Sequence, residues 1–279
     1  MQNIDYPVRR ADDKTTLLDF IARKLSLSKK AAKAIIDLRS VSVNGTRIWM
    51  ARHALAVGDS VTILRDGIDV SGPARRPVPI LFRDKHCVVA AKPAGVLSCG
   101  PKSLETLLQE QLGIATLKAV HRLDRDTSGC LLFACDDETN ERLIAAFRAK
   151  TVTKVYHAIV HGPMKRGEHR VSKPIGGKTA VSNVRVLDVS SNATHVAVSI
   201  ETGRTHQIRI HLASIRHPVM GDRKYASGVK LSEKLSGIPR QMLHAQALRF
   251  RHPFTDALMR VTAPLPPDFQ ACLSTFKLT

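Results

Sequence analysis

A proline-rich stretch near position 75 constrains the fold of this chain more than any other feature of the sequence. Residues 70–79 contain three prolines and one glycine. Proline has no backbone N–H to donate and restricts the residue before it, so a helix or a central strand cannot continue through the stretch. We therefore predict a linker over residues 71–78. It separates a small N-terminal domain, residues 1–70, from a larger domain, residues 79–279.

The charge of the chain indicates its kind of partner. The 279 residues include 43 Lys and Arg against 24 Asp and Glu, a net charge of +19. Both domains are basic, so the charge is not confined to a tail. A chain this basic usually binds a polyanion, because each neutralised phosphate releases a counterion. The alternative is that the charge serves solubility alone.

Several classes of protein find no support in the sequence. It has no run of about 18 apolar residues to span a membrane, and no basic flank leading into an apolar secretory segment. Neither a phosphate-binding P-loop nor a Gly-x-Gly-x-x-Gly is present, and the histidines lack metal-ligand spacing. The five cysteines form no Cys-x-x-Cys. We expect a cytoplasmic protein with reduced thiols, no membrane contact, no cofactor and no metal.

The small domain combines two helices with short strands. Apolar residues recur at helical spacing from Leu17 to Leu25, with Thr16 as the N-cap, and a second helix follows Ser28. A short strand over residues 41–43 ends in an Asn-Gly turn, and residues 57–63 supply a return strand. Over residues 12–65 this order resembles the S4 RNA-binding module. The resemblance implies RNA binding by four basic residues: Lys29, Lys30, Lys33 and Arg39. The alternative is an ordinary solvated helix face.

The larger domain mixes strands and helices without regular alternation. Residues 87–91, 130–135 and 152–160 have the apolar or alternating pattern of strands, and residues 104–112 and those after Asp136 that of helices. This mixture favours an α+β fold over a doubly wound one.

Two segments concentrate side chains that could carry chemistry. Residues 121–129, His-Arg-Leu-Asp-Arg-Asp-Thr-Ser-Gly, place Asp124 between Arg122 and Arg125 just before a strand. Guanidinium groups favour an ionised carboxylate, which could act as a nucleophile or general base; the alternative is a polar turn. Residues 202–211 hold a cluster that could bind a phosphate or a buried carboxylate, or could be a basic surface strand. Its members are Arg204, His206 and Arg209.

A third segment, Lys154-Val-Tyr156, lies in the strand predicted over residues 152–160. Tyrosine is scarce here, with three in the chain. Residues two apart share a strand face, so Tyr156 could stack on a base while Lys154 holds a phosphate. Packing in the core is the alternative.

Together these segments resemble the RluA-type pseudouridine synthase family. The matching stretches are residues 92–95 (Lys-Pro-Ala-Gly), 121–129, 154–156, 177–180, 202–211 and 217–225. The resemblance covers about residues 79–265. It implies a catalytic domain built on a mixed, mainly antiparallel sheet flanked by helices. It also implies that Asp124 is the essential catalytic residue, Arg209 its ion-pair partner and Tyr156 the group that stacks on the target base.

The remaining basic side chains are expected to bind the substrate. Arg122 would hold the RNA open around a flipped nucleotide, and the other substrate-binding residues would be Arg125, Lys154, Arg204 and His206. An S4-like module in front is the arrangement of family members that modify large-subunit ribosomal RNA. This favours ribosomal over transfer RNA. Two rival functions are a non-catalytic RNA-binding or ribosome-assembly protein and a nucleosidase that releases uracil. With no coiled coil in the sequence, we expect a monomer.

Overall fold

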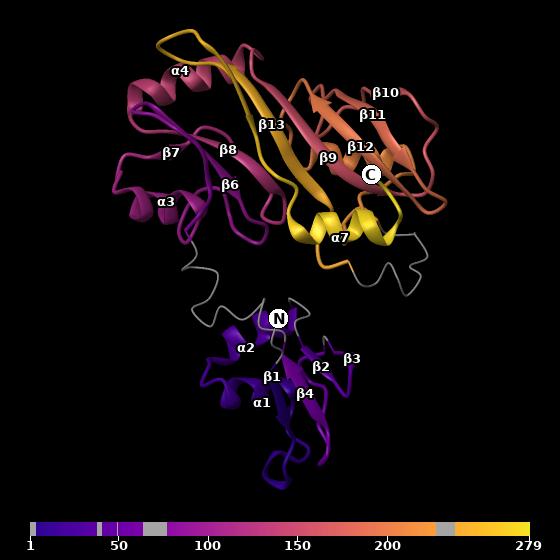
Figure 1. Ribbon diagram of the computed structural model, residues 1–279. Coiled ribbons are helices and arrows are strands. Elements are labelled where there is room, and N and C mark those ends of the chain that lie inside the picture. Colours follow the sequence, from indigo (N-terminus) through magenta and orange to yellow (C-terminus); the bar gives the residue numbers. More distant parts are fainter. Residues whose placement is uncertain (1–3, 38–40, 49, 64–76, 227–237) are drawn as a thin grey trace. The chain divides into compact units, whose positions relative to one another are not determined.

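The chain divides into two compact units, residues 1–76 and residues 77–279 (Figure 1). The computed structural model describes residues 4–37, 41–48, 50–63, 77–226 and 238–279. Most of the predicted linker, residues 71–76, lies outside them. Val78 is buried in the second unit, where its backbone N–H and C=O both bond to the side-chain amide of Gln111.

The N-terminal unit packs two helices on a four-stranded antiparallel sheet of order β1-β4-β2-β3. Thr16 caps the first helix by accepting the backbone N–H of Asp19 at 3.1 Å, as predicted. The buried core includes Phe20, Ile36 and Val61. The elements are β1 (Ile4–Pro7), η1 (Arg10–Asp12), α1 (Leu17–Lys24), α2 (Lys29–Asp37), β2 (Val41–Val43), β3 (Thr46–Arg47) and β4 (Ser60–Ile63).

The C-terminal unit is built on one large mixed sheet. The order of the strands is β10-β11-β12-β9-β13-β8-β6-β5, with β14 beside β13 and β7 beside β8. All described pairs are antiparallel except β13 with β8. The predicted α+β fold with a mainly antiparallel sheet is therefore confirmed. The strands are β5 (Ile80–Arg83), β6 (Cys87–Lys92), β7 (Lys118–Ala119), β8 (Ser128–Ala134), β9 (Thr153–His161), β10 (Glu168–Val171), β11 (Ser182–Val189), β12 (Ala193–Ile200), β13 (Leu243–Arg251) and β14 (Leu258–Thr262).

Helices cover both faces of this sheet. Helices α3 (Leu104–Leu112) and α5 (Gln207–Ser214) pack on the face that includes Tyr156, Ala158 and Val160 of β9. Helices α4 (Asp137–Arg148) and α7 (Pro267–Thr275) pack on the opposite face, α7 against Ile159. The alternation along β9 follows from the two-residue repeat of a strand. No helix in the described ranges is long and apolar enough to cross a bilayer.

The parallel contact between β8 and β13 requires glycine at position 129. Gly129 lies opposite Ala245 with φ +118°, a conformation that side chains strongly disfavour. A Cβ added there would lie 2.2 Å from the carbonyl oxygen of Ala245. The close approach matters for function because Gly129 ends the segment that begins at His121 and contains Asp124.

We predict that Gly129→Ala destabilises the C-terminal unit by more than backbone strain alone, which is about 1–3 kcal/mol. The matched control is Gly167→Ala, since Gly167 has φ +120° and open space around it. Urea denaturation followed by circular dichroism measures both variants. Equal losses of unfolding free energy would contradict the proposed clash with Ala245.

Candidate active site

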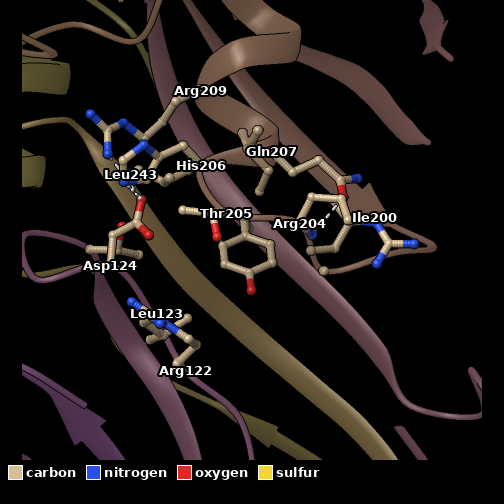
Figure 2. A pocket seen from close by; sticks show the side chains of 14 residues that line it. Arg122, Leu123, Asp124, Ile200, Arg204, Thr205, His206, Gln207, Arg209 and Leu243 are labelled. Atoms are coloured by element: carbon tan, nitrogen blue, oxygen red, sulfur yellow. Dashed lines mark hydrogen bonds and ion pairs between the residues drawn. The ribbon is translucent and has the colours of Figure 1, made fainter. Parts of the chain in front are cut away.

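A cavity on the α5 side of the sheet brings the three predicted segments together (Figure 2). The loop before β8, the strand β9 and the segment from the end of β12 into α5 all contribute side chains. The lining residues are Arg122, Leu123, Asp124, Thr127, Tyr156, Ile200, Gly203, Arg204, Thr205, His206, Gln207, Ile208, Arg209 and Leu243.

Asp124 and Arg209 meet at this cavity although 85 residues separate them in the sequence. Nη1 of Arg209 donates to Oδ2 of Asp124 at 3.1 Å, and the Asp124 side chain is 21% exposed. The ion pair implied by the family resemblance is therefore present. Arg125, the neighbour of Asp124 in the sequence, forms no ion pair with it, and its Nε donates instead to the carbonyl of Gly95 at 3.1 Å.

A second carboxylate holds the other side of Arg209. Its Nε and Nη2 donate to Oδ2 and Oδ1 of Asp222 at 2.6 and 3.0 Å. Oδ1 of Asp222 also accepts the backbone N–H groups of Lys224 and Tyr225. A bidentate pair fixes the plane of a guanidinium group. Asp222 thus aims the remaining Nη1 of Arg209 at Asp124.

Burial makes this arrangement electrostatically strong. The side chain of Asp222 is 0% exposed and that of Arg209 is 10% exposed. Burial on its own raises the pKa of Asp222, but hydrogen bonds from Arg209 and the two amides outweigh it and leave the pKa below its usual value. Burial likewise lowers the pKa of Arg209, but the pairs with Asp222 and Asp124 raise it overall. Both groups are charged at neutral pH.

Side chains from distant elements hold the loop that carries Asp124. The carbonyl groups of residues 123 and 125–127 accept hydrogen bonds from Ser98, Lys92 and Arg240. Lys92 is fully buried, and its ammonium group has three carbonyl acceptors at 2.8–2.9 Å. Burial lowers the pKa of Lys92 to about 7, against the opposing effect of Asp126. The backbone at Asp124 is therefore fixed before any substrate binds.

Tyr156 supplies an aromatic ring to the cavity from the middle of β9. It is 7% exposed and packs in the main core. Burial, and secondarily the charge of Asp124, raises the pKa of its hydroxyl, so the phenol is neutral. An uncharged ring beside Asp124 suits stacking against a planar base.

His206 stands at the start of α5 with φ 56°, in the left-handed region that non-glycine residues seldom adopt. Its Nδ1 lies 2.9 Å from the hydroxyl of Tyr225, and its Nε2 lies 3.8 Å from Oδ2 of Asp124. Burial lowers the pKa of His206, with Asp124 acting against that shift. A neutral imidazole at this distance orients the site rather than neutralising Asp124.

Gln207 organises the segment before α5, and the sequence analysis missed it. Its Oε1 accepts the Thr202 hydroxyl at 2.6 Å and the backbone N–H of Arg204 at 3.1 Å. Its Nε2 donates to the carbonyl of Val181 and the hydroxyl of Ser182. Arg204 lines the cavity, and its Nε donates to the carbonyl of Thr179. The segment is an extended turn into a helix, not a basic surface strand.

The other predicted substrate residues divide between the cavity and its surroundings. Arg122 is exposed and lines the cavity. Arg125 and Lys154 do not line it. The ammonium group of Lys154 lies 5.5 Å from the ring centroid of Phe147, and burial lowers its pKa.

The predicted RNA-binding lysines belong to the N-terminal unit. Lys29 is paired with Asp19 at 2.8 Å, and Lys33 with Asp37 at 2.7 Å. Both lysine side chains are more than half exposed, and surface pairs of this kind contribute about 1 kcal/mol or less. The side chain of Lys30 and all of Arg39 lie outside the described residues.

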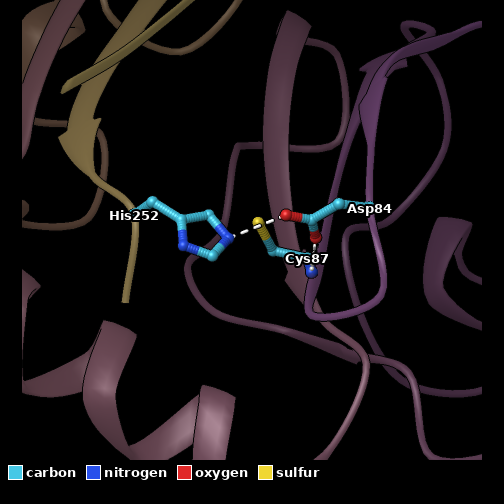
Figure 3. A group of neighbouring side chains, drawn as sticks. All are labelled: Asp84, Cys87 and His252. Carbon is cyan, nitrogen blue, oxygen red and sulfur yellow. Dashed lines mark hydrogen bonds and ion pairs between the residues drawn. The ribbon is translucent and has the colours of Figure 1, made fainter. Parts of the chain in front are cut away.

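One cluster of potential metal ligands occurs in the described part of the chain, formed by Asp84, Cys87 and His252 (Figure 3). Nε2 of His252 lies 2.7 Å from Oδ2 of Asp84, and its Nδ1 accepts two backbone N–H groups. Oδ1 of Asp84 accepts the backbone N–H of Cys87. Burial raises the pKa of the Cys87 thiol to about 12, so it stays protonated. These hydrogen bonds join two turns, and the absence of a metal remains a prediction.

Asp222 and Tyr225 are two further residues of the site that sequence reasoning left without a role. They lie in residues 217–225, a segment that matched the family motif without any role being assigned to its individual residues. The available signal was a single carboxylate at Asp222 followed at once by Arg223 and Lys224. That pattern does not identify Arg209 as the ion-pair partner of Asp222.

Comparisons with known proteins identify the family to which the chain belongs. The model of the RNA pseudouridylate synthase family matches residues 86–214. Ribosomal large subunit pseudouridine synthase D of Pseudomonas aeruginosa is 36% identical over 229 residues, which cover 71% of each chain. The protein of the same name from Pasteurella multocida is 31% identical over 283 residues, 90% of this chain and 87% of that protein.

A solved structure supports the same assignment. Human RNA Pseudouridylate Synthase Domain Containing 4 has a TM-score of 0.61 and 28% identity, covering 72% of this chain and 94% of its own. The chain belongs to the RNA pseudouridine synthase family, whose members are isomerases that act on RNA.

We predict that Asp222→Ala lowers the free energy of unfolding by about 3–5 kcal/mol, because it leaves Arg209 buried without its main partner. The pKa of Asp222 lies below its usual 3.8. The advantage of the wild type is therefore fully present above pH 3.8 and disappears as the pH falls below that value.

The control is Glu138→Ala, which removes an exposed pair with Arg142 at 2.7 Å and costs under about 1 kcal/mol. Urea denaturation at several pH values compares the variants. Equal, pH-independent losses in both would refute the structural role of Asp222.

Proposed function

We propose that this enzyme converts specific uridines of large-subunit ribosomal RNA to pseudouridine, with Asp124 as the catalytic residue. The observation that carries the proposal is the meeting of Asp124, Arg209 and Tyr156 at one cavity. The two relatives compared above are named ribosomal large subunit pseudouridine synthase D.

The target uridine must leave its stack before it can enter the cavity. Flipping a base costs a few kcal/mol. Arg122, exposed at the cavity, supports the displaced nucleotide by contacting the RNA backbone and filling the gap it leaves. Stacking on Tyr156 contributes roughly 1–3 kcal/mol, which offsets much of the cost.

Asp124 then acts at the ribose, either by attack on C1′ or by removal of a sugar proton. Arg209 orients its carboxylate through the 3.1 Å contact, and the neutral Tyr156 and His206 add no competing charge. The N1–C1′ bond breaks and a C5–C1′ bond forms. N1 gains a proton and C5 loses one, so the reaction is an isomerisation. The detached uracil turns within the cavity while stacked on Tyr156.

The N-terminal unit supplies the preference for ribosomal RNA in this proposal. Residues 12–65 act as an S4-like RNA-binding domain, which binds RNA through Lys29, Lys30, Lys33 and Arg39. The exposed pairs of Lys29 and Lys33 are weak enough for phosphate to replace their carboxylate partners. Transfer RNA is the alternative substrate. The five free cysteines favour the cytoplasm, and we expect a monomer.

The test is tritium release from RNA labelled at uracil C5. We predict release by the wild type and none by Asp124→Asn, which retains the shape of the side chain and RNA binding. The control is Asp256→Asn, an exposed change at a turn outside the cavity, which keeps full release.

Ribosomal and transfer RNA transcripts are compared in parallel, and release from transfer RNA alone would reassign the substrate. Free uracil among the products would indicate a nucleosidase instead. Full activity of Asp124→Asn would contradict the catalytic role of Asp124, and binding without release from any RNA would favour a non-catalytic binding protein.

A further inference from the structure

A second hollow lies on the other face of the large sheet. On β9 it is lined by Thr153, Val155 and His157, which alternate with the cavity residue Tyr156 and therefore point the opposite way. Its lining residues all differ from those of the active-site cavity. We call it the arginine groove, and its lining is Thr153, Val155, His157, Arg185, Ala197, Gln246, Ala247, Arg249, Leu258, Arg260 and Thr262.

The strand register explains the shape of the arginine groove. In one cross-strand row Arg185 pairs with Ala197, which pairs in turn with His157. Ala197 and Ala247 are small, so the sheet is hollowed where they lie. Arginines stand on both sides of this floor, Arg185 on β11 and two more on β13 and β14.

The charge of the arginine groove is unbalanced. Arg249 and Arg260 lie directly opposite each other on paired antiparallel strands. Like charges in that position destabilise a sheet. All three arginines are exposed, and none has an ion pair or side-chain hydrogen bond to the rest of the described chain. The groove contains no carboxylate of its own.

Two nearby carboxylates are engaged elsewhere, and a third, Glu168 on β10, lies directly opposite Arg185 in the strand register without forming an ion pair with it. Asp256, at the turn between β13 and β14, pairs with Arg251 at 2.9 Å. Glu201, just after β12, pairs with Arg170 at 2.8 Å. Three exposed arginines that form no ion pair within the described chain thus line one groove, which is the arrangement that a ligand with several anionic groups would complement.

One further group in the arginine groove lacks a partner. Oε1 of Gln246 is buried and accepts no hydrogen bond from any described residue. A buried polar atom of this kind is costly to leave unpaired. A rotation of the side chain toward the groove would let Oε1 accept from a ligand hydroxyl, such as the 2′-hydroxyl of ribose.

We propose that the arginine groove is a second RNA contact, which binds the sugar-phosphate backbone of the substrate at a distance from the target uridine. This inference rests on the proposed function for the identity of the ligand as RNA. A large folded RNA can reach both faces of the domain at once. Contacts on the second face increase affinity for a long substrate without touching the chemistry at Asp124.

The first test removes the three arginines together, as Arg185→Gln, Arg249→Gln and Arg260→Gln. The control triple variant removes three exposed charges outside both hollows, as Arg148→Gln, Lys165→Gln and Lys277→Gln. Binding of a long large-subunit ribosomal RNA transcript is measured over a range of salt concentrations. Each lost phosphate contact lowers the slope of log affinity against log salt by about 1.

We expect the salt slope of the groove variant to be smaller in magnitude than that of the wild type by about 3, and that of the control to change much less. In the tritium-release assay, measured over a range of transcript concentrations, kcat should stay at the wild-type value while KM rises. Equal loss of slope in both triple variants would overturn the proposal. Absence of release by the wild type, with the binding difference intact, would instead contradict the proposed function alone.

A single variant checks that the effect is not one of folding. Arg249→Gln relieves the repulsion with Arg260, so the Tm measured without RNA should stay level or rise. A clear fall in Tm would show that Arg249 stabilises the sheet, and it would overturn the assignment of this arginine to RNA binding.

Discussion

The buried ion pair between Asp222 and Arg209 is the interaction on which the site depends. Asp222 is fully buried and already accepts two backbone N–H groups, so its position is set by the fold. It engages Nε and Nη2 of Arg209, which leaves Nη1 directed at Asp124. The carboxylate of Asp124 is thereby oriented by a group that is itself held in place, at no further entropic cost when a substrate binds.

The loop on the other side of the cavity is fixed by buried basic side chains whose hydrogen bonds are satisfied. Lys92 and Arg240 donate to carbonyls of the loop that carries Asp124, and Arg240 is held in turn by Asp268 at 2.6 Å. Gly129 lets this loop run into β8 against β13. Two rigid supports therefore meet at Asp124, and Tyr156 lies on the strand between them. A rigid cavity with a carboxylate beside an aromatic ring suits the proposed reaction, in which a detached base must turn without escaping.

Local sequence patterns correctly predicted the features that depend on neighbouring residues, such as helices, caps and strands. The helix over residues 104–112, the cap at Thr16 and the strand at β6 follow from spacing and capping, and the structure has them as predicted or within a residue. Long-range pairing is different, because it depends on strand order. From sequence position alone, the predicted charge partners of Asp124 were its neighbours Arg122 and Arg125. The family resemblance suggested Arg209, but nothing in the chain pointed to Asp222 as the residue that aims it. The arginine groove was equally hidden, because its three arginines converge only through the register of β11, β13 and β14.

The most direct test of this account is the single-turnover rate of Asp222→Asn on RNA bound to saturation. Asparagine keeps the size of the side chain and an oxygen for the backbone N–H groups of Lys224 and Tyr225, but it loses the charge that fixes Arg209. Loss of a charged hydrogen bond of about 1.5–3 kcal/mol predicts a rate about tenfold to a hundredfold slower, with the Kd for RNA unchanged. A variant that folds and reacts at the wild-type rate would show that Asp124 does not depend on the buried pair.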